Sequence, residues 1–146
     1  MEKEADLVAI YRTALIQRPY AAVRYWAFGL GKLEMDDRLV WATLTKNDRQ
    51  AAGYSGNDDA DLVQILSSIE EADIAVLFTE QTGGNVKVSW RARPGIDVSQ
   101  IALQFGGGGH PAASGAELPG SVEEVRALIL PASKMLLESN GNEKEL

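Results

Sequence analysis

Apolar and polar positions along the 146-residue chain alternate between helical and strand-like periods. Residues 4–18 and 20–33 repeat apolar side chains every three to four positions, the period of one helical face. Residues 38–45 are rich in β-branched and aromatic side chains and alternate as a strand does. The pattern therefore predicts two helices followed by a first strand.

The middle of the chain has the clearest pattern. Residues 59–69 predict a helix with an acidic entrance. Residues 74–78 form a continuous apolar run, which is typical of a strand buried on both faces. Gly83 and Gly84 mark a turn, after which residues 86–93 return as the second strand of a hairpin.

The last third of the chain also alternates between helix and strand. A capping box at residues 97–100 predicts a helix up to Phe105, and residues 113–118 predict a short strand. Ser121 and Glu124 form a second capping box before the final helix. We therefore predict a single α/β domain, with one mixed β-sheet of about four to five strands flanked by helices.

Charge and composition narrow the range of partners. The formal net charge of −7 opposes non-specific adhesion to nucleic acid, so any phosphate must be bound at a small, focused site. The chain has no cysteine, which excludes disulfides and thiolate metal sites. It has neither an apolar run long enough to span a membrane nor the apolar core of a secretion signal. We expect a cytoplasmic protein without a membrane partner.

The predicted strand at residues 86–93 carries a polar side chain at every second position, and these positions share one face of the sheet. They are Lys87, Ser89, Arg91 and Arg93. Arginine presents a planar fork of donors that matches phosphate oxygens. The alternative interpretation is an exposed sheet face where cations prevent edge-to-edge pairing.

A glycine run forms the second candidate for binding. It consists of Gly106, Gly107, Gly108 and Gly109, and it is followed by His110 and Pro111. Glycines allow main-chain N–H groups to turn toward an anion. We expect His110 to cap a helical turn that begins at Pro111, with its positive end facing the same anion. The alternative is a flexible linker, although linkers usually mix glycine with serine.

Other groups favour binding over catalysis. Asp58, Asp59 and Asp61 could hold a hard cation, but an acidic helix start is the simpler interpretation. His110 is the only histidine, which excludes a multi-histidine metal centre. The glycine run also lacks the Lys-Ser/Thr pair of a nucleotide-binding loop. We therefore predict no catalytic residue and no metal ligand in this chain.

Residues 89–93 (Ser-Trp-Arg-Ala-Arg) and 105–116 (Phe-Gly-Gly-Gly-Gly-His-Pro-Ala-Ala-Ser-Gly-Ala) together resemble a known family. It is the C-terminal, DHH-associated (DHHA-type) domain of the DHH phosphoesterase superfamily, related to RecJ-type exonucleases. The resemblance is strongest over residues 86–118. It implies that the substrate-binding residues are Ser89, Arg91, Arg93, Gly106, Gly107, Gly108, Gly109 and His110.

The resemblance also implies a domain organisation. In this superfamily an N-terminal domain with an Asp-His-His motif binds divalent ions, commonly manganese, and hydrolyses the substrate. This chain contains no Asp-His-His. We therefore expect residues 1–35 to be a helical lead-in to an absent catalytic domain, residues 36–138 to bind substrate, and residues 139–146 to form a flexible tail. The isolated chain is expected to be inactive, and its parent protein to be a metal-dependent phosphodiesterase or phosphatase.

Several ligands and two other functions stay open at this level. The segment 105–116 is most similar to family members that degrade short oligoribonucleotides, dephosphorylate 3′-phosphoadenosine 5′-phosphate or cleave cyclic dinucleotides. The sequence does not choose among short single-stranded RNA, phosphoadenosine phosphate and cyclic dinucleotides. The expected protein partner is the N-terminal DHH domain, and a homodimer is compatible with the sequence. The other functions are a tRNA-binding domain like that appended to alanyl-tRNA synthetase, and a structural or dimerising module.

Overall fold

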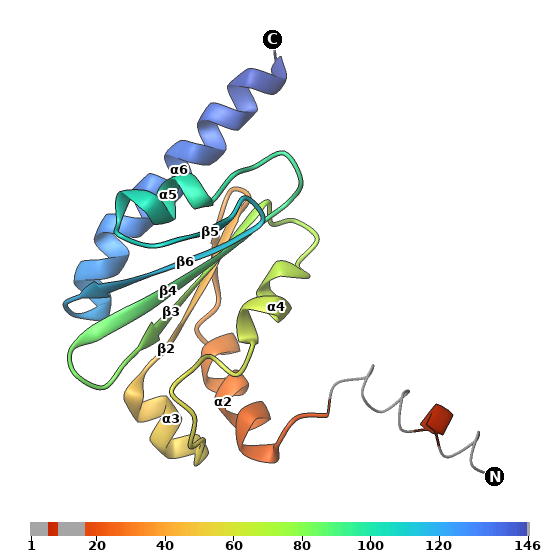
Figure 1. The fold of residues 1–146 in the computed structure, drawn as a ribbon, viewed down its shortest axis with the longest axis vertical. Helices are drawn as coiled ribbons and strands as arrows, with labels where there is room; N and C mark the ends of the chain where they lie inside the picture. Colours follow the sequence, from red (N-terminus) through yellow and green to blue (C-terminus); the bar gives the residue numbers. More distant parts are fainter. Residues whose placement is uncertain (1–5, 9–16, 146) are drawn as a thin grey trace.

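The computed structural model describes residues 6–8 and 17–145 (Figure 1). Most of the helix predicted over residues 4–18 therefore lies outside the described residues. The elements follow the predicted alternation of helix and strand. They are α2 (Tyr20–Leu30), β1 (Glu34–Asp36), β2 (Leu39–Leu44), α3 (Lys46–Ala52), α4 (Leu62–Ser67), β3 (Ile74–Glu80), β4 (Asn85–Ala92), α5 (Ser99–Gln104), β5 (Gly108–His110), β6 (Ala113–Pro119) and α6 (Val122–Glu145).

All strands belong to one mixed sheet, which confirms the predicted fold class. The strand order is β1-β2-β3-β4-β6-β5, and the sheet has six strands instead of the expected four to five. Strands β2 and β3 are parallel, joined by a crossover through α3 and α4, and the other neighbours are antiparallel. The two additional strands, β1 and β5, have three residues each and lie at the two edges.

Helices cover the sheet from both sides (Figure 1). On one face, Val76, Val88 and Trp90 pack with α5 and α6 in the first hydrophobic cluster. On the other face, Ala75 and Leu77 pack with α2, α3 and α4 in the second cluster. Strand β3 contributes to both clusters, so the continuous apolar run of residues 74–78 is buried on both faces, as predicted.

The helix starts differ in how well the sequence predicted them. The capping box of α6 is formed, because the backbone N–H of Glu124 donates to Oγ of Ser121 at 3.1 Å. The helix predicted from the capping box at residues 97–100 begins one position later than that box implies. The N-cap of α5 is Val98, and Asp97 Oδ1 instead accepts from the backbone N–H of Ser99 at 3.0 Å. Helix α6 continues to Glu145, where the sequence predicted a flexible tail from residue 139.

One buried polar pair fastens α6 to the sheet. The indole N–H of Trp90 donates to Oγ of Ser133 at 3.1 Å, and that hydroxyl donates to the carbonyl of Ile129 at 2.9 Å. Trp90 and Ser133 are both fully buried. The hydroxyl therefore accepts from the only polar group of a large core side chain, where water cannot replace it.

Replacing Ser133 by alanine is expected to lower the free energy of unfolding by about 1–3 kcal/mol, because it leaves the buried indole N–H without an acceptor. Urea denaturation followed by tryptophan fluorescence measures this change. Ser139→Ala removes the same hydroxyl from an exposed position of α6 and should change stability by less than about 0.5 kcal/mol. Equal effects of the two substitutions would contradict the assignment.

Candidate functional site

The polar face of β4 lies on the side of the sheet that helices cover only in part. The second hydrophobic cluster holds α2, α3 and α4 against this face. It contains apolar residues of β2 and β3 but none of β4, β5 or β6. The apolar side chains of β4 instead belong to the cluster on the opposite face. Helix α4 still contacts part of β4 on this face, and Ser89 is buried there, whereas β6 and β5 lie outside the second cluster. We call the face of β4, β6 and β5 that carries Arg91 the open face.

Strand register places the predicted residues on the open face in rows. Arg91 pairs with Ala113 of β6, and Ala113 pairs with His110 of β5. Residues paired directly across a sheet point to the same side. Arg91 and His110 therefore share one face, two strands apart, which separates their backbones by about 10 Å. This row, Arg91–Ala113–His110, is the first row of the site.

The second row lies two residues further along the strands. Ser89 pairs with Gly115, and Gly115 pairs with Gly108. Two of its three members have no side chain, so the floor of the open face is flat at this row. Ser89 is nearly buried, with 9% of its surface exposed.

The glycine run has a different role from the one predicted. The N–H of Gly106 donates to the carbonyl of Leu103 at 3.2 Å, and that of Gly107 donates to the carbonyl of Ala102 at 2.7 Å. Because both N–H groups already donate to carbonyls of α5, they are not available to bind an anion. Gly108, Gly109 and His110 form β5, which pairs with β6 along one edge only.

Close packing explains why glycine is needed in this segment. A Cβ atom at Gly107 would lie 2.0 Å from the carbonyl oxygen of Gly115. A Cβ atom at Gly109 would lie 2.6 Å from the carbonyl oxygen of Ala113, and this residue has a φ of 143°. The helical turn expected at Pro111 is absent, because Pro111 lies in the turn between β5 and β6. His110 ends a strand and is exposed.

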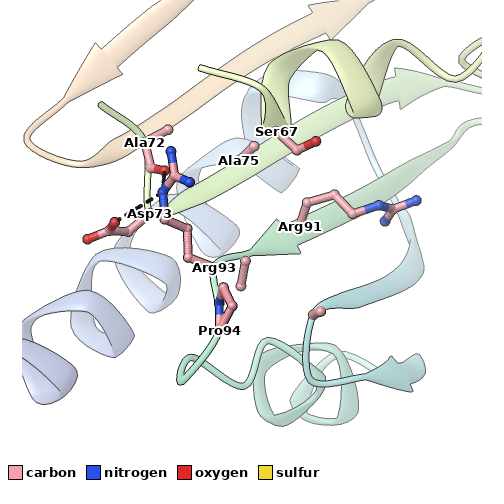
Figure 2. Close-up of a pocket in the computed structure, with 9 residues that line it drawn as sticks. Ser67, Ala72, Asp73, Ala75, Arg91, Arg93 and Pro94 are labelled. Carbon is pink, nitrogen blue, oxygen red and sulfur yellow. Dashed lines mark hydrogen bonds and ion pairs between the residues drawn. The ribbon is translucent and has the colours of Figure 1, made fainter. Parts of the chain in front are cut away.

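Arg91 lines a cavity of about 230 Å³ at the end of β4 (Figure 2). Arg91 is partly buried, and its Nη1 donates to the carbonyl of Trp90 at 2.9 Å. Within the described part of the chain, none of the ion pairs involves Arg91. The guanidinium therefore keeps a positive charge that no carboxylate of these residues neutralises at contact distance.

Arg93 lies on the other side of the same cavity, but its guanidinium makes its hydrogen bonds within the protein. Its Nε donates to the carbonyl of Ala72 at 2.8 Å, and Nη2 donates to the carbonyls of Ile69 and Glu70 at 3.0 and 2.8 Å. Asp73 lies 3.6 Å from Nε. Figure 2 shows the two arginine side chains extending in different directions, with Arg93 directed at Asp73 and Ala72. The alternation that predicted a shared face fails here, because β4 ends at Ala92.

The structure thus brings together some of the predicted residues and separates others. Arg91 and His110 share a row, and Ser89 and Gly108 form the next one. The cavity itself is lined by Arg91 and Arg93 but not by His110 or by the glycines. The sequence did not single out the small residues that shape this cavity, since only packing reveals them. They are Ser67, Ala72, Ala75 and Ala112.

The acidic residues before α4 organise the backbone. Asp58 Oδ1 accepts from the N–H of Ala60 at 2.9 Å, and Asp59 accepts from the N–H groups of Asp61 and Val63. These contacts agree with the interpretation as a helix start. Among the described residues, no group of three or more His, Asp or Glu side chains is arranged to hold a metal ion. The residues present do not fit the divalent ions of the superfamily, and we derive no step that uses a metal here.

Comparison with known proteins agrees with the predicted family and fold class. The DHHA1 domain family matches residues 36–137, and the chain belongs to this family. The bifunctional oligoribonuclease and PAP phosphatase NrnA of Thermus thermophilus is 41% identical over 85 residues, which cover 58% of this chain and 26% of that protein. The protein of the same name from Mycoplasma pneumoniae is 39% identical over 66 residues, covering 45% of this chain and 20% of that protein. The matches therefore span about a quarter or less of these relatives.

Solved structures extend the likeness over most of the chain. An exopolyphosphatase-related protein from Bacteroides fragilis superposes with a TM-score of 0.75 at 25% identity, covering 90% of this chain and 38% of that protein. A pGpG-specific phosphodiesterase, PggH from Vibrio cholerae, superposes with a TM-score of 0.52 at 14% identity, covering 77% of this chain and 36% of that protein. This second likeness concerns the fold alone. None of the helices in the described residues has the length and apolar character that crossing a membrane requires.

Replacing Arg93 by lysine is expected to lower the free energy of unfolding by about 1–2 kcal/mol, since an ammonium group cannot replace a fork that donates to three carbonyls. Arg91→Lys should cost less than about 0.5 kcal/mol, because the Arg91 guanidinium donates to a single carbonyl, that of Trp90. Thermal denaturation of both variants against the wild type measures the difference. A larger loss in Arg91→Lys would show that the two roles are reversed.

Proposed function

We propose that this chain is the nucleotide-binding domain of a DHH phosphoesterase. In this proposal Arg91 holds a substrate phosphate on the open face, and His110 with the free edge of β5 contacts the same nucleotide. The observation that carries the proposal is the position of Arg91, a guanidinium without an ion pair among the described residues, in one row with His110. Membership of the DHHA1 family supports it.

The charge distribution supports a small anionic ligand. The chain carries a formal net charge of −7, so its surface as a whole repels polyanions. Arg38 and Arg93 are paired with Asp73, whereas Arg91 has no carboxylate partner in residues 6–8 and 17–145. A charge-assisted hydrogen bond from such a guanidinium to a phosphate contributes about 1.5–3 kcal/mol. The ligand is therefore held by one focused charge, which suits a substrate with few phosphates.

The edge of β5 supplies a second type of contact. It is the terminal strand of the sheet, so its outer backbone edge has no strand beside it in the described chain. Close approach to a ligand is possible there because the residues that precede His110 in β5 have no side chains. This contact replaces the expected binding of an anion by the N–H groups of the glycine run, since Gly106 and Gly107 donate within the protein.

Ser89 and Arg93 take lesser parts in this proposal. Ser89 lies next to Arg91 on the same face and places a hydroxyl at the floor of the second row. Arg93 donates to carbonyls of the loop between α4 and β3, and so shapes the cavity beside Arg91. Its effect on a ligand is therefore indirect.

Hydrolysis is assigned to a DHH domain outside this chain, which would hold a divalent metal such as manganese. The relatives named oligoribonuclease and PAP phosphatase suggest short RNA or 3′-phosphoadenosine 5′-phosphate as the ligand. Each presents a nucleoside that carries phosphate. Because the same chemistry recognises both, the open face can accept either.

In amide NMR titrations, phosphoadenosine phosphate and the dinucleotide pApA are expected to shift the resonances of Arg91, Gly108 and His110 in the isolated wild-type chain. Arg91→Ala should weaken both ligands by about tenfold or more, because the phosphate loses its charged donor. Arg126→Ala is the matched control. It removes the same charge from α6, where Arg126 reaches Thr43 at 3.2 Å on the opposite face of the sheet.

The spectra of each variant also show whether it is folded. If Arg91→Ala and Arg126→Ala weakened ligand binding equally, the cause would be the net charge of the chain and not the position of Arg91, which would contradict the proposal. Shifts confined to α5 and α6 would instead place the ligand on the covered face. A response of the open face to tRNA but to neither nucleotide would favour the tRNA-binding alternative.

A further inference from the structure

A third row closes the open face at the end away from Arg91. Lys87 of β4 pairs with Glu117 of β6, so both side chains point to the same side as Arg91 and Ser89. Glu117 is exposed, and its Oε1 accepts from the side-chain amide of Asn85 at 3.4 Å. The first and third rows are four residues apart along β4, which corresponds to about 13–14 Å.

The floor between these two rows has little relief. Gly115 and Gly108 carry no side chain, and Ala113 of the first row carries a methyl group. A ligand anchored at Arg91 can therefore lie along β6 without steric hindrance until it reaches Glu117. We call this strip, from Arg91 to Glu117, the trough.

A second carboxylate lies near the third row. Asp58 is exposed in the segment before α4, and α4 packs on the same face of the sheet as the trough. The hydrogen bond from Tyr54 is the main cause that lowers the pKa of Asp58, and the charge of Lys87 adds to it. Burial and then the bond to Asp58 raise the pKa of Tyr54 to about 12, so the phenol stays a donor. Asp58 is therefore ionised at neutral pH.

The trough thus changes sign along its length. Its first row carries the positive charge of Arg91. Its third row pairs Lys87 with Glu117, and Asp58, whose charge interacts with that of Lys87, adds a second carboxylate beside this row. A phosphate is attracted at the first row and repelled by a net negative charge at the third.

We propose that Glu117, supported by Asp58, limits the length of the nucleotide chain that this domain accepts. The inference rests on the proposed function, because it requires a nucleotide anchored at Arg91. A mononucleotide or dinucleotide fits between the two rows. The phosphates of a longer chain running along the trough meet the carboxylates, so added nucleotides do not add affinity.

The test compares ligands of different length on the isolated chain. Dissociation constants for pApA and for a five-nucleotide adenylate are measured by amide NMR titration for wild type, Glu117→Gln and Glu123→Gln. Glu123 is exposed on α6, which packs on the opposite face, so this control removes the same charge away from the trough. The readout is the ratio of the two dissociation constants, which cancels effects common to both ligands.

Glu117→Gln is expected to tighten binding of the five-nucleotide ligand about fivefold while changing pApA less than about twofold. Glu123→Gln should leave the ratio unchanged. Raising the salt concentration should reduce the difference between wild type and Glu117→Gln, because exposed charges are screened. An unchanged ratio in Glu117→Gln, or the same change in both variants, would overturn the length limit.

Failure of the proposed function has a separate signature. If wild type does not respond to pApA at millimolar concentration, or Arg91→Ala binds it as wild type does, the phosphate is not held at Arg91 and both proposals fail. If Arg91→Ala weakens pApA but Glu117→Gln leaves the ratio unchanged, only the length limit fails.

Discussion

The two-residue alternation of β4 is the constraint on which the rest of the structure depends. Trp90 points into the cluster under α5 and α6, where Ser133 accepts its indole N–H. The next residue, Arg91, must then point to the opposite side of the sheet. The same backbone that Trp90 anchors in the core therefore fixes the direction of Arg91.

The direction of the Arg91 side chain matters because helices cover this face of the sheet unevenly. Helices α2, α3 and α4 bury β2 and β3 on the second face, and α4 also contacts part of β4, so Arg91 leaves β4 beside a cavity that Ser67 of α4 also lines. Two residues later the chain has left the sheet, and Arg93 is bound to the loop between α4 and β3, which includes Asp73. Arginines two positions apart thus have different roles, because one lies within the strand and the other beyond its end.

Local patterns were sufficient to predict the fold class and the long elements. The apolar run in β3, the alternation in β4 and the capping box at Ser121 each depend on neighbours within a few residues. The short strands β1 and β5 were missed because three residues are too few to show a period. Helix α3 was missed although Thr45 and Asp48 form a capping box, whose Thr-x-x-Asp spacing is visible in the sequence.

The glycine run shows why part of the site could not be predicted. From the sequence alone, four glycines suggest N–H groups that are free to bind an anion. In the structure, two of these N–H groups donate to carbonyls of α5. The close approach of Gly107 and Gly109 to β6 comes from pairing with residues that follow them in the chain. Their conformational freedom therefore serves strand packing first, and any contact with a ligand comes from the edge that this packing leaves open.

Solvent exposure of the open face bears on how the proposed binding domain would operate. A partly buried arginine beside solvent attracts a phosphate through a high effective dielectric, so the contact contributes less at an exposed surface than it would in a closed cleft. A second domain closing over the same face would exclude water and strengthen the contact without moving Arg91. Backbone pairing fixes the rows of the sheet. Arg91, Gly115 and Glu117 would therefore keep their positions when such a domain closed. The fold thus supplies one rigid surface, and under the proposed function its affinity for a nucleotide would depend on what covers that surface.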